Sequence, residues 1–272
     1  MFKKNRSIVS TVFISLVSLF PIISKKLWGA WYNYLATHDN SNSFSFMNYG
    51  FKDDRLISLS DEDEVNRLQI QLYEHTLNYE NISNKTLLEI GSGRGGGLDY
   101  LSRSKQLKSL TGIDLSIEAI NRSKTNYSST LLNFMQGAAD NLPFEDKSYD
   151  IVLNVESSHC YPDMKSFVTE AYRVLKDEGV FCLCDLRNEV GVMAIEKIFI
   201  ECGFKIKQKN IITQNVLKAL DTMSIDRLKI AGKLPVFLRK AFIDFSGIHS
   251  STAYDLLKNN KLIYVSYQLM KD

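Results

Sequence analysis

The chain has 272 residues, of which 44% are apolar and 24% are charged. This is the balance of an ordinary globular protein, and it excludes the disordered and collagen-like classes. The length suffices for one large α/β domain or two small domains. The net charge of +2 gives no general reason to expect nucleic-acid binding.

The basic charge is concentrated at the N-terminus. Residues 1–26 contain five basic residues and no acidic residue, so the rest of the chain has a net charge of −3. The basic residues are Lys3, Lys4, Arg6, Lys25 and Lys26. We therefore expect two parts, an apolar and basic segment of residues 1–26 and a mildly acidic domain of residues 27–272.

The apolar sequence between the basic residues, SIVSTVFISLVSLFPIIS, allows three interpretations. Its hydroxyl side chains recur on one side of a helical pattern, which is typical of a helix lying in a membrane interface beside anionic lipid. The same helix could instead cap the core of the domain. A cleaved signal peptide or a spanning helix fits less well, because no small-residue cleavage site follows and Pro21 interrupts a short apolar run.

Aromatic residues and a helical pattern come next. Trp28, Trp31, Tyr34 and Phe46 either line a lipid tunnel or belong to the core. A helix-like run follows from Asp61 to Asn78.

Short apolar segments alternate with helical patterns from residue 86 onward. The predicted strands are 86–90, 110–115, 131–137, 149–155, 180–186, 204–212 and 262–270, and the predicted helices between the first six are 95–105, 116–127, 163–176 and 189–202. A long helical region with a break near Gly232 precedes the last strand. This alternation predicts parallel βαβ units in a doubly wound sheet, with the last strand compatible with an antiparallel pair at the edge.

The cysteines and histidines show no metal-binding pattern. Cys160, Cys182, Cys184 and Cys202 form no CxxC motif, and the four histidines are scattered. We expect buried thiols in a reducing compartment and no metal site.

A glycine loop follows the first predicted strand in LLEIGSGRGGG. Glycines in such a loop let the backbone approach a ligand at a helix N-terminus. The spacing of these glycines fits both a dinucleotide-binding fingerprint and the loop of S-adenosylmethionine enzymes. Asp114 ends the next strand, where a carboxylate can bind both ribose hydroxyls. Glu89 lies inside the first strand, where an apolar residue is the default. A carboxylate there suits a cationic amino group, which favours S-adenosylmethionine over NAD.

Five segments resemble motifs of the class I S-adenosylmethionine-dependent methyltransferases. They are LEIGSGRG, TGIDLS, GAADNLPF, SYDIVLNVESSHCYPD and AYRVLKDEGVFCLCD. The resemblance implies an α/β fold with a doubly wound, seven-stranded Rossmann-like methyltransferase sheet, an antiparallel last strand and an N-terminal helical extension. It also implies S-adenosyl-L-methionine as the cofactor.

The resemblance also implies which residues bind the cofactor. The adenine loop of the family usually has an acidic residue where this chain has Ala138, so Asp140 or backbone groups are left to contact the adenine of the cofactor. The implied cofactor-binding residues are Tyr49, Glu89, Gly91, Ser92, Gly93, Asp114, Leu115, Ala138, Ala139 and Asn154.

A narrower resemblance covers about residues 25–272 and is to the phthiotriol/phenolphthiotriol dimycocerosates methyltransferases. It is carried by KKLWGAWYNYL, FMNYGF, NRLQIQLYEHT, NVESSHCYPD and CDLR. It implies O-methylation of a hydroxyl on a hydrophobic, lipid or polyketide-like acceptor. The apolar segment before Lys25 has no counterpart in that family.

His159 is the predicted general base. It follows the fourth predicted strand, at the edge where an open α/β sheet builds its site, and an ordinary pKa of about 6.5 suits a base at neutral pH. Similar small-molecule O-methyltransferases use a histidine in an ESxHxxPD segment and an aspartate ending the next strand, which correspond to His159 and Asp185. Glu156 is the alternative base.

Three other functions remain open from the sequence: C-methylation of a prenyl or sterol-like acceptor, an inactive cofactor-binding partner subunit, and an NAD-dependent oxidoreductase. Because the cofactor is made in the cytosol and the expected acceptor is hydrophobic, we expect the protein on the cytoplasmic side of a membrane. Residues 1–26 would then bring it to the membrane surface.

Overall fold

The computed structural model describes residues 45–55, 57–78, 82–233, 239, 243, 247–249 and 251–272. The segment of residues 1–26, the predicted N-terminal extension, and Trp28, Trp31 and Tyr34 lie outside these residues, as does part of the predicted break after Gly232. Phe46 and Tyr49 lie within them.

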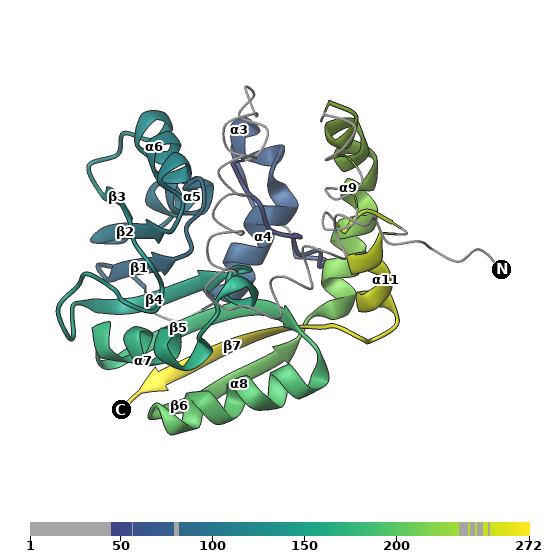
Figure 1. The fold of residues 1–272 in the computed structure, drawn as a ribbon. Coiled ribbons are helices and arrows are strands. Elements are labelled where there is room, and N and C mark those ends of the chain that lie inside the picture. Colours follow the sequence, from purple (N-terminus) through teal and green to yellow (C-terminus); the bar gives the residue numbers. More distant parts are fainter. Residues whose placement is uncertain are drawn as a thin grey trace.

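The described residues form one seven-stranded sheet with the order β3-β2-β1-β4-β5-β7-β6 (Figure 1). The strands are β1 (Thr86–Ile90), β2 (Ser109–Asp114), β3 (Leu132–Gln136), β4 (Tyr149–Val155), β5 (Leu175–Arg187), β6 (Phe204–Ile211) and β7 (Ile263–Lys271). Strands β1 to β5 pair in parallel, and β7 pairs antiparallel with both β5 and β6. The predicted doubly wound sheet and antiparallel last strand are confirmed.

Helices cover both faces of the sheet. They are α3 (Asp61–Glu64), α4 (Arg67–Thr76), α5 (Gly96–Ser104), α6 (Ile117–Asn126), α7 (Met164–Val174), α8 (Glu189–Glu201), α9 (Thr213–Lys233) and α11 (Thr252–Lys258). One core contains residues of α4, α5, α6, α9 and α11, and the other contains residues of α7 and α8, which lie on the opposite face in Figure 1. Neighbouring residues of β1 alternate between the two cores, since Leu87 packs into the first core and Leu88 into the second.

The fifth strand begins earlier than its sequence predicts. The helical pattern was expected to reach residue 176, but α7 ends at Val174 and β5 begins at Leu175. Leu175 pairs with Tyr149, and the pairing resumes between Val180 and Ile151, so residues 176–179 form a bulge. Pairing with β4 therefore overrides the helical preference of this segment.

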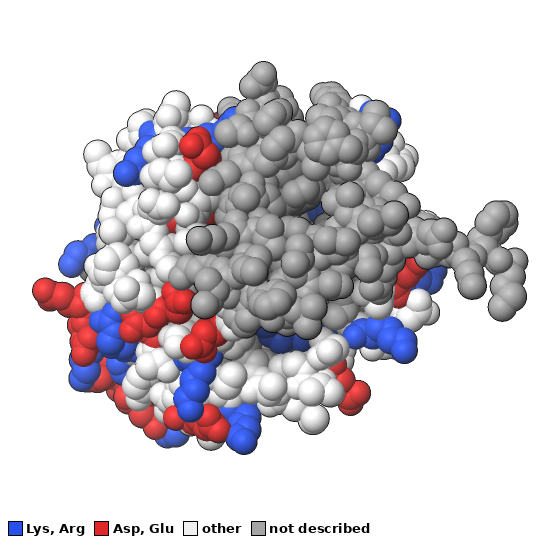
Figure 2. Space-filling model, in the orientation of Figure 1, with Lys and Arg blue, Asp and Glu red and all other residues white. Residues whose placement is uncertain are grey.

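Basic and acidic side chains are interspersed on the described surface seen in Figure 2. Exposed ion pairs such as Lys147–Asp177, at 2.7 Å, join some of them. Among the described residues, no helix has the length and apolar character needed to cross a membrane.

Candidate active site at the carboxyl edge of the sheet

The glycine loop joins β1 to α5 and is held against its neighbours. The backbone N–H groups of Gly91 and Ser92 donate to the carbonyl of Ile113 in β2, at 2.8 and 3.1 Å. Gly91 and Gly93 both adopt positive φ, 78° and 54°. A Cβ on Gly91 would lie 2.3 Å from Ser157 Oγ, whereas a Cβ on Gly93 would meet no atom of the described residues within 4 Å. The loop is therefore tightly packed at Gly91 and open at Gly93.

Asp114 ties the end of β2 to this loop. Its Oδ2 accepts a hydrogen bond from the backbone N–H of Gly93 (2.9 Å), and its Oδ1 accepts one from that of Ser116 (2.8 Å). Burial raises the pKa of Asp114, and these hydrogen bonds oppose the rise. Each carboxylate oxygen has a second lone pair, so Asp114 can still accept hydrogen bonds from a ligand. The next residue, Leu115, is partly exposed.

Glu89 is fully buried at the end of β1. The hydroxyl of Tyr73 donates to its Oε1 at 2.7 Å. Its Oε2 is buried and has no hydrogen-bond partner among the described residues. Burial raises the pKa of Glu89 to about 8, with the Tyr73 hydrogen bond lowering it and the charge of Asp114 raising it.

Two more buried oxygens near the loop lack partners within the described part of the chain: Asn154 Oδ1 and Ser92 Oγ. The Asn154 amide donates from Nδ2 to the carbonyl of Ile90 at 2.8 Å, which places this side chain beside the end of β1. Buried polar atoms without partners are costly unless a ligand satisfies them. Together with Glu89 Oε2 they provide three acceptors around the loop, which fits a ligand with an ammonium group and hydroxyls.

The segment after β3 lies next to Asp114, because the N–H of Gly137 donates to the Asp114 carbonyl at 2.9 Å. Ala138 and Ala139 follow and are partly buried. Ala138 pairs with Asn141 in a single antiparallel bridge. The structure thus brings the predicted adenine loop to the same edge as the glycine loop and Asp114.

His159 and Asp185 meet at the ends of β4 and β5. His159 Nδ1 lies 2.7 Å from Asp185 Oδ1, and the His159 backbone N–H donates to Asp185 Oδ2, also at 2.7 Å. The His159 side chain is 28% exposed, whereas that of Asp185 is 1% exposed. A buried carboxylate therefore orients a partly accessible imidazole.

His159 and Asp185 shift each other's pKa. Burial lowers the pKa of His159, but interactions with Cys160 and Asp185 outweigh it and hold that pKa well above 6.5. Burial raises the pKa of Asp185, but His159 and Arg187 outweigh it and hold that pKa well below its usual range. Asp185 is therefore ionised at neutral pH.

Ser158 and Arg187 complete the surroundings of Asp185 and were not predicted as site residues. The Ser158 hydroxyl donates to Asp185 Oδ2 at 2.5 Å, and Arg187 Nη2 donates to Ser158 Oγ at 2.6 Å. Arg187 lies two residues after Asp185 in the CDLR segment, which was a usable signal.

Glu156 is held by two donors on a single oxygen. Its Oε2 accepts hydrogen bonds from the backbone N–H of Tyr49 (2.6 Å) and from the hydroxyl of Tyr264 (2.7 Å). Burial raises its pKa to about 7, and these two hydrogen bonds lower it. The guanidinium of Arg227 lies 5.6 Å from the centre of the Tyr49 ring. Sequence reasoning missed Tyr264 and Arg227, because each lies far along the chain from Glu156 and belongs to no motif.

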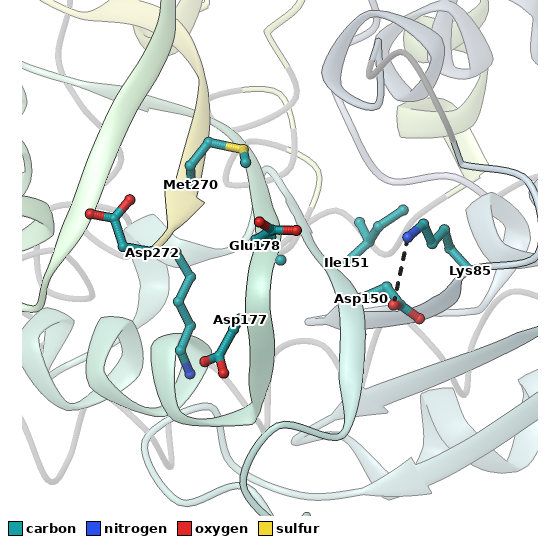
Figure 3. Close-up of a pocket in the computed structure, with 9 residues that line it drawn as sticks. Lys85, Asp150, Ile151, Asp177, Glu178, Met270 and Asp272 are labelled. Atoms are coloured by element: carbon teal, nitrogen blue, oxygen red, sulfur yellow. Dashed lines mark ion pairs between the residues drawn. The ribbon is translucent and has the colours of Figure 1, made fainter.

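A separate pocket of about 480 Å³ lies at the other edge of the sheet (Figure 3). It is formed by the start of β4, the bulge of β5 and the end of β7, and its lining includes the ion pair Lys85–Asp150 at 3.9 Å. Ligands of open α/β sheets bind at the carboxyl ends of the strands. None of the predicted site residues lines this pocket, so we place the active site at the carboxyl edge instead.

Comparison with known proteins identifies the family. Residues 88–183 match the model of the methyltransferase domain. The phthiotriol/phenolphthiotriol dimycocerosates methyltransferase of Mycobacterium tuberculosis is 34% identical over 251 residues, covering 91% of this chain and 93% of that protein. A fatty-acid O-methyltransferase of Mycolicibacterium smegmatis is 34% identical over 243 residues, covering 88% of each chain.

The fold is also similar to that of a solved structure, geranyl diphosphate C-methyltransferase from Streptomyces coelicolor in complex with S-adenosyl-L-homocysteine. The TM-score is 0.66 at 15% identity, covering 92% of this chain and 98% of that one. The chain is therefore an S-adenosylmethionine-dependent methyltransferase, and it belongs to the family of the phthiotriol/phenolphthiotriol dimycocerosates methyltransferases.

Proposed function

We propose that this enzyme methylates a hydroxyl group of a hydrophobic, lipid-type acceptor, with His159 as the general base. The observation that carries the proposal is the 2.7 Å contact between His159 Nδ1 and the buried carboxylate of Asp185. It fixes the ring so that Nδ1 donates to Asp185 and Nε2 is the atom that accepts a proton. A base oriented by a buried carboxylate suits an alcohol, which must lose its proton as the new bond forms.

Each site residue has a separate proposed role in the reaction. S-adenosylmethionine supplies a methyl group already activated on a sulfonium. Glu89 and Asn154 would hold the ammonium group of the cofactor, and Asp114 would hold its ribose hydroxyls. The bound cofactor would supply the methyl group to the acceptor oxygen and keep its sulfur as a neutral thioether. His159 accepts the proton that the acceptor hydroxyl loses. Asp185 stabilises the resulting imidazolium, so positioning and proton transfer provide the catalysis.

Support for a lipid-type acceptor comes from the relatives. Their names state phthiotriol and fatty-acid substrates, and both are at least a third identical over most of this chain. A second candidate is C-methylation of a prenyl-like acceptor, which the similarity of fold to a geranyl diphosphate C-methyltransferase favours.

The test is to incubate the purified enzyme with a lipid extract and S-adenosylmethionine carrying an isotope-labelled methyl group. We expect label in a lipid, on oxygen, as determined by mass spectrometry, and a rate of labelling about 10²–10⁴-fold lower when His159→Ala enzyme is used. Label on carbon would replace the proposal by the second candidate. Label only in water-soluble molecules would contradict a lipid-type acceptor.

We further propose that residues 1–26 bring the domain to the cytoplasmic face of a membrane. Their +5 charge and apolar centre support this, because lysines near a surface add attraction to anionic lipid. Deleting residues 1–24 should move the protein from the membrane pellet to the supernatant. A matched variant with Lys3, Lys4 and Arg6 changed to serine should bind anionic vesicles more weakly than the intact chain. An unchanged pellet after the deletion would contradict the proposal.

A further inference from the structure

We propose that Tyr73, on α4, is a positioning residue for the cofactor: it holds Glu89 so that the second carboxylate oxygen faces the ammonium group of S-adenosylmethionine. This inference rests on the cofactor-binding role proposed above for Glu89. Tyr73 lies in the LQIQLYEHT helix, outside the glycine loop, the ribose motif and the adenine loop.

The hydrogen bonds of Glu89 are divided between its two oxygens. Oε1 accepts from the Tyr73 hydroxyl at 2.7 Å, and Oε2 is buried without a partner among the described residues. Glu89 is 0% exposed and Tyr73 is 7% exposed. A buried carboxylate with a single neutral donor is under-satisfied, because such a group can accept several hydrogen bonds. The remaining oxygen is thus suited to a charged donor from a ligand.

Gly97 provides the space for the Tyr73 ring. A Cβ on Gly97 would lie 2.1 Å from Tyr73 Cζ and 2.4 Å from its hydroxyl oxygen. Gly97 has no positive φ, so its backbone conformation does not require glycine. Glycine inside a helix costs about 1 kcal/mol relative to alanine. The close approach of Tyr73 is the structural reason for glycine at this position, and Phe46 packs edge-on against the same ring with 5.8 Å between ring centres.

The hydrogen bond also favours the charged form of Glu89. Burial and the charge of Asp114 raise the pKa of Glu89, and the Tyr73 hydrogen bond is the contribution that lowers it, giving about 8. The other titratable groups that act on this pair are Cys184 of β5 and Glu156 after β4, which raise the pKa of Tyr73. An ammonium group binds the carboxylate form, so binding below pH 8 requires Glu89 to release a proton.

Removing the Tyr73 hydroxyl should therefore raise the pKa of Glu89 and weaken cofactor binding more at low pH than at high pH. The amino group of the ligand also titrates in the alkaline range, but it does so equally for every variant. The ratio of variant to wild-type dissociation constants therefore isolates the change in the protein.

The experiment compares Tyr73→Phe with Tyr100→Phe by calorimetry with S-adenosylhomocysteine at pH 6.5 and pH 9. Tyr100 is a matched control, because its hydroxyl donates to Glu74 Oε1 at 2.6 Å and it is 5% exposed. Loss of a hydrogen bond to a charged group predicts a dissociation constant about tenfold or more higher for Tyr73→Phe at pH 6.5, with a smaller ratio at pH 9. Tyr100→Phe should bind as wild type at both pH values. An equal loss in both variants, or no loss in Tyr73→Phe, would overturn the proposal.

The Glu89→Gln variant distinguishes a failure of the role proposed for Tyr73 from a failure of the role proposed for Glu89. If Glu89→Gln binds as well as wild type, the cofactor role of Glu89 fails. If it binds weakly while Tyr73→Phe binds normally, only the role of Tyr73 fails. In the Glu89→Gln background, Tyr73→Phe should cause no further loss that depends on pH. A loss of the same size and pH dependence as in the wild-type background would show that Tyr73 does not act through Glu89.

Discussion

The two sides of the active site differ in how far the protein satisfies its own polar groups. Around the cofactor loop, Glu89 Oε2, Ser92 Oγ and Asn154 Oδ1 are buried without partners among the described residues. On the acceptor side, each oxygen of Asp185 accepts two hydrogen bonds from the protein.

This difference indicates two ways of preparing a site. The proposed cofactor side leaves acceptors for a ligand that brings donors. On the proposed acceptor side, contacts within the chain orient His159, the proposed base, before any substrate arrives. Three predictions test that division, from the largest expected effect to the smallest.

The largest effect is expected from His159→Ala. A general base contributes about 10²–10⁴-fold to a rate, so kcat should fall by about that factor. Cofactor affinity, measured by calorimetry, should stay at the wild-type value, because His159 belongs to the acceptor side. Glu156→Gln keeps an oxygen for the Tyr49 and Tyr264 donors and should lower kcat less. A larger loss for Glu156→Gln than for His159→Ala would make Glu156 the base.

A smaller effect, on cofactor affinity and stability, is expected from alanine substitutions at two glycines of the loop. Alanine at either Gly91 or Gly93 adopts a left-handed conformation that costs about 1–2 kcal/mol. At Gly93 the methyl group would meet no atom of the part of the chain that the structure describes, so we expect cofactor affinity to fall about 10- to 100-fold with only that stability cost.

Gly91→Ala is the contrasting variant. Its methyl group would meet Ser157, which should cost about a further 1–3 kcal/mol of stability. Thermal unfolding and cofactor titration of both proteins check the pair. If Gly93→Ala bound the cofactor normally, the open space at Gly93 would not be part of the cofactor site.

The smallest effect is expected in the pH dependence of kcat/KM for the acceptor. Interactions with its neighbours hold the pKa of His159 well above 6.5, so the neutral ring that can accept a proton becomes more abundant as the pH rises. With saturating cofactor, kcat/KM for the acceptor should rise about tenfold per pH unit and level off above that pKa. Asp185→Asn removes one of the interactions that raise the pKa of His159, so the weaker activity of this variant should level off at lower pH. A profile that is flat from pH 6.5 upward in the wild type would contradict this assignment.

Much of the fold was predictable because its signals are local. The alternation of apolar strands and amphipathic helices predicted all seven strands to within a few residues, except at the start of β5. There, the bulge at residues 176–179 depends on pairing with β4, which a helical pattern cannot reveal.

The candidate site was predictable where motifs lie at strand ends. Parallel strands bring Glu89, Asp114, His159 and Asp185 to one edge, and the pairing of His159 with Asp185 was implied by the resemblance to O-methyltransferases with an ESxHxxPD segment. Tyr73 and Tyr264 were missed because their hydroxyl groups reach the site from a separate helix and from the last strand. Their roles depend on packing between segments, and neither residue has a neighbouring sequence signal.

The position of β7 has a consequence for how the protein is synthesised. The strand lies between β5 and β6, although both leave the ribosome before it. Until residues 263–271 emerge, the edges of β5 and β6 that β7 will cover are unpaired, and unpaired strand edges are prone to bind other chains. Tyr264, which donates to Glu156, arrives with the same strand. Closing the sheet and completing the acceptor side are therefore one late event, so a ribosome stalled before residue 263 would hold a chain able to form its glycine loop but not its finished active site.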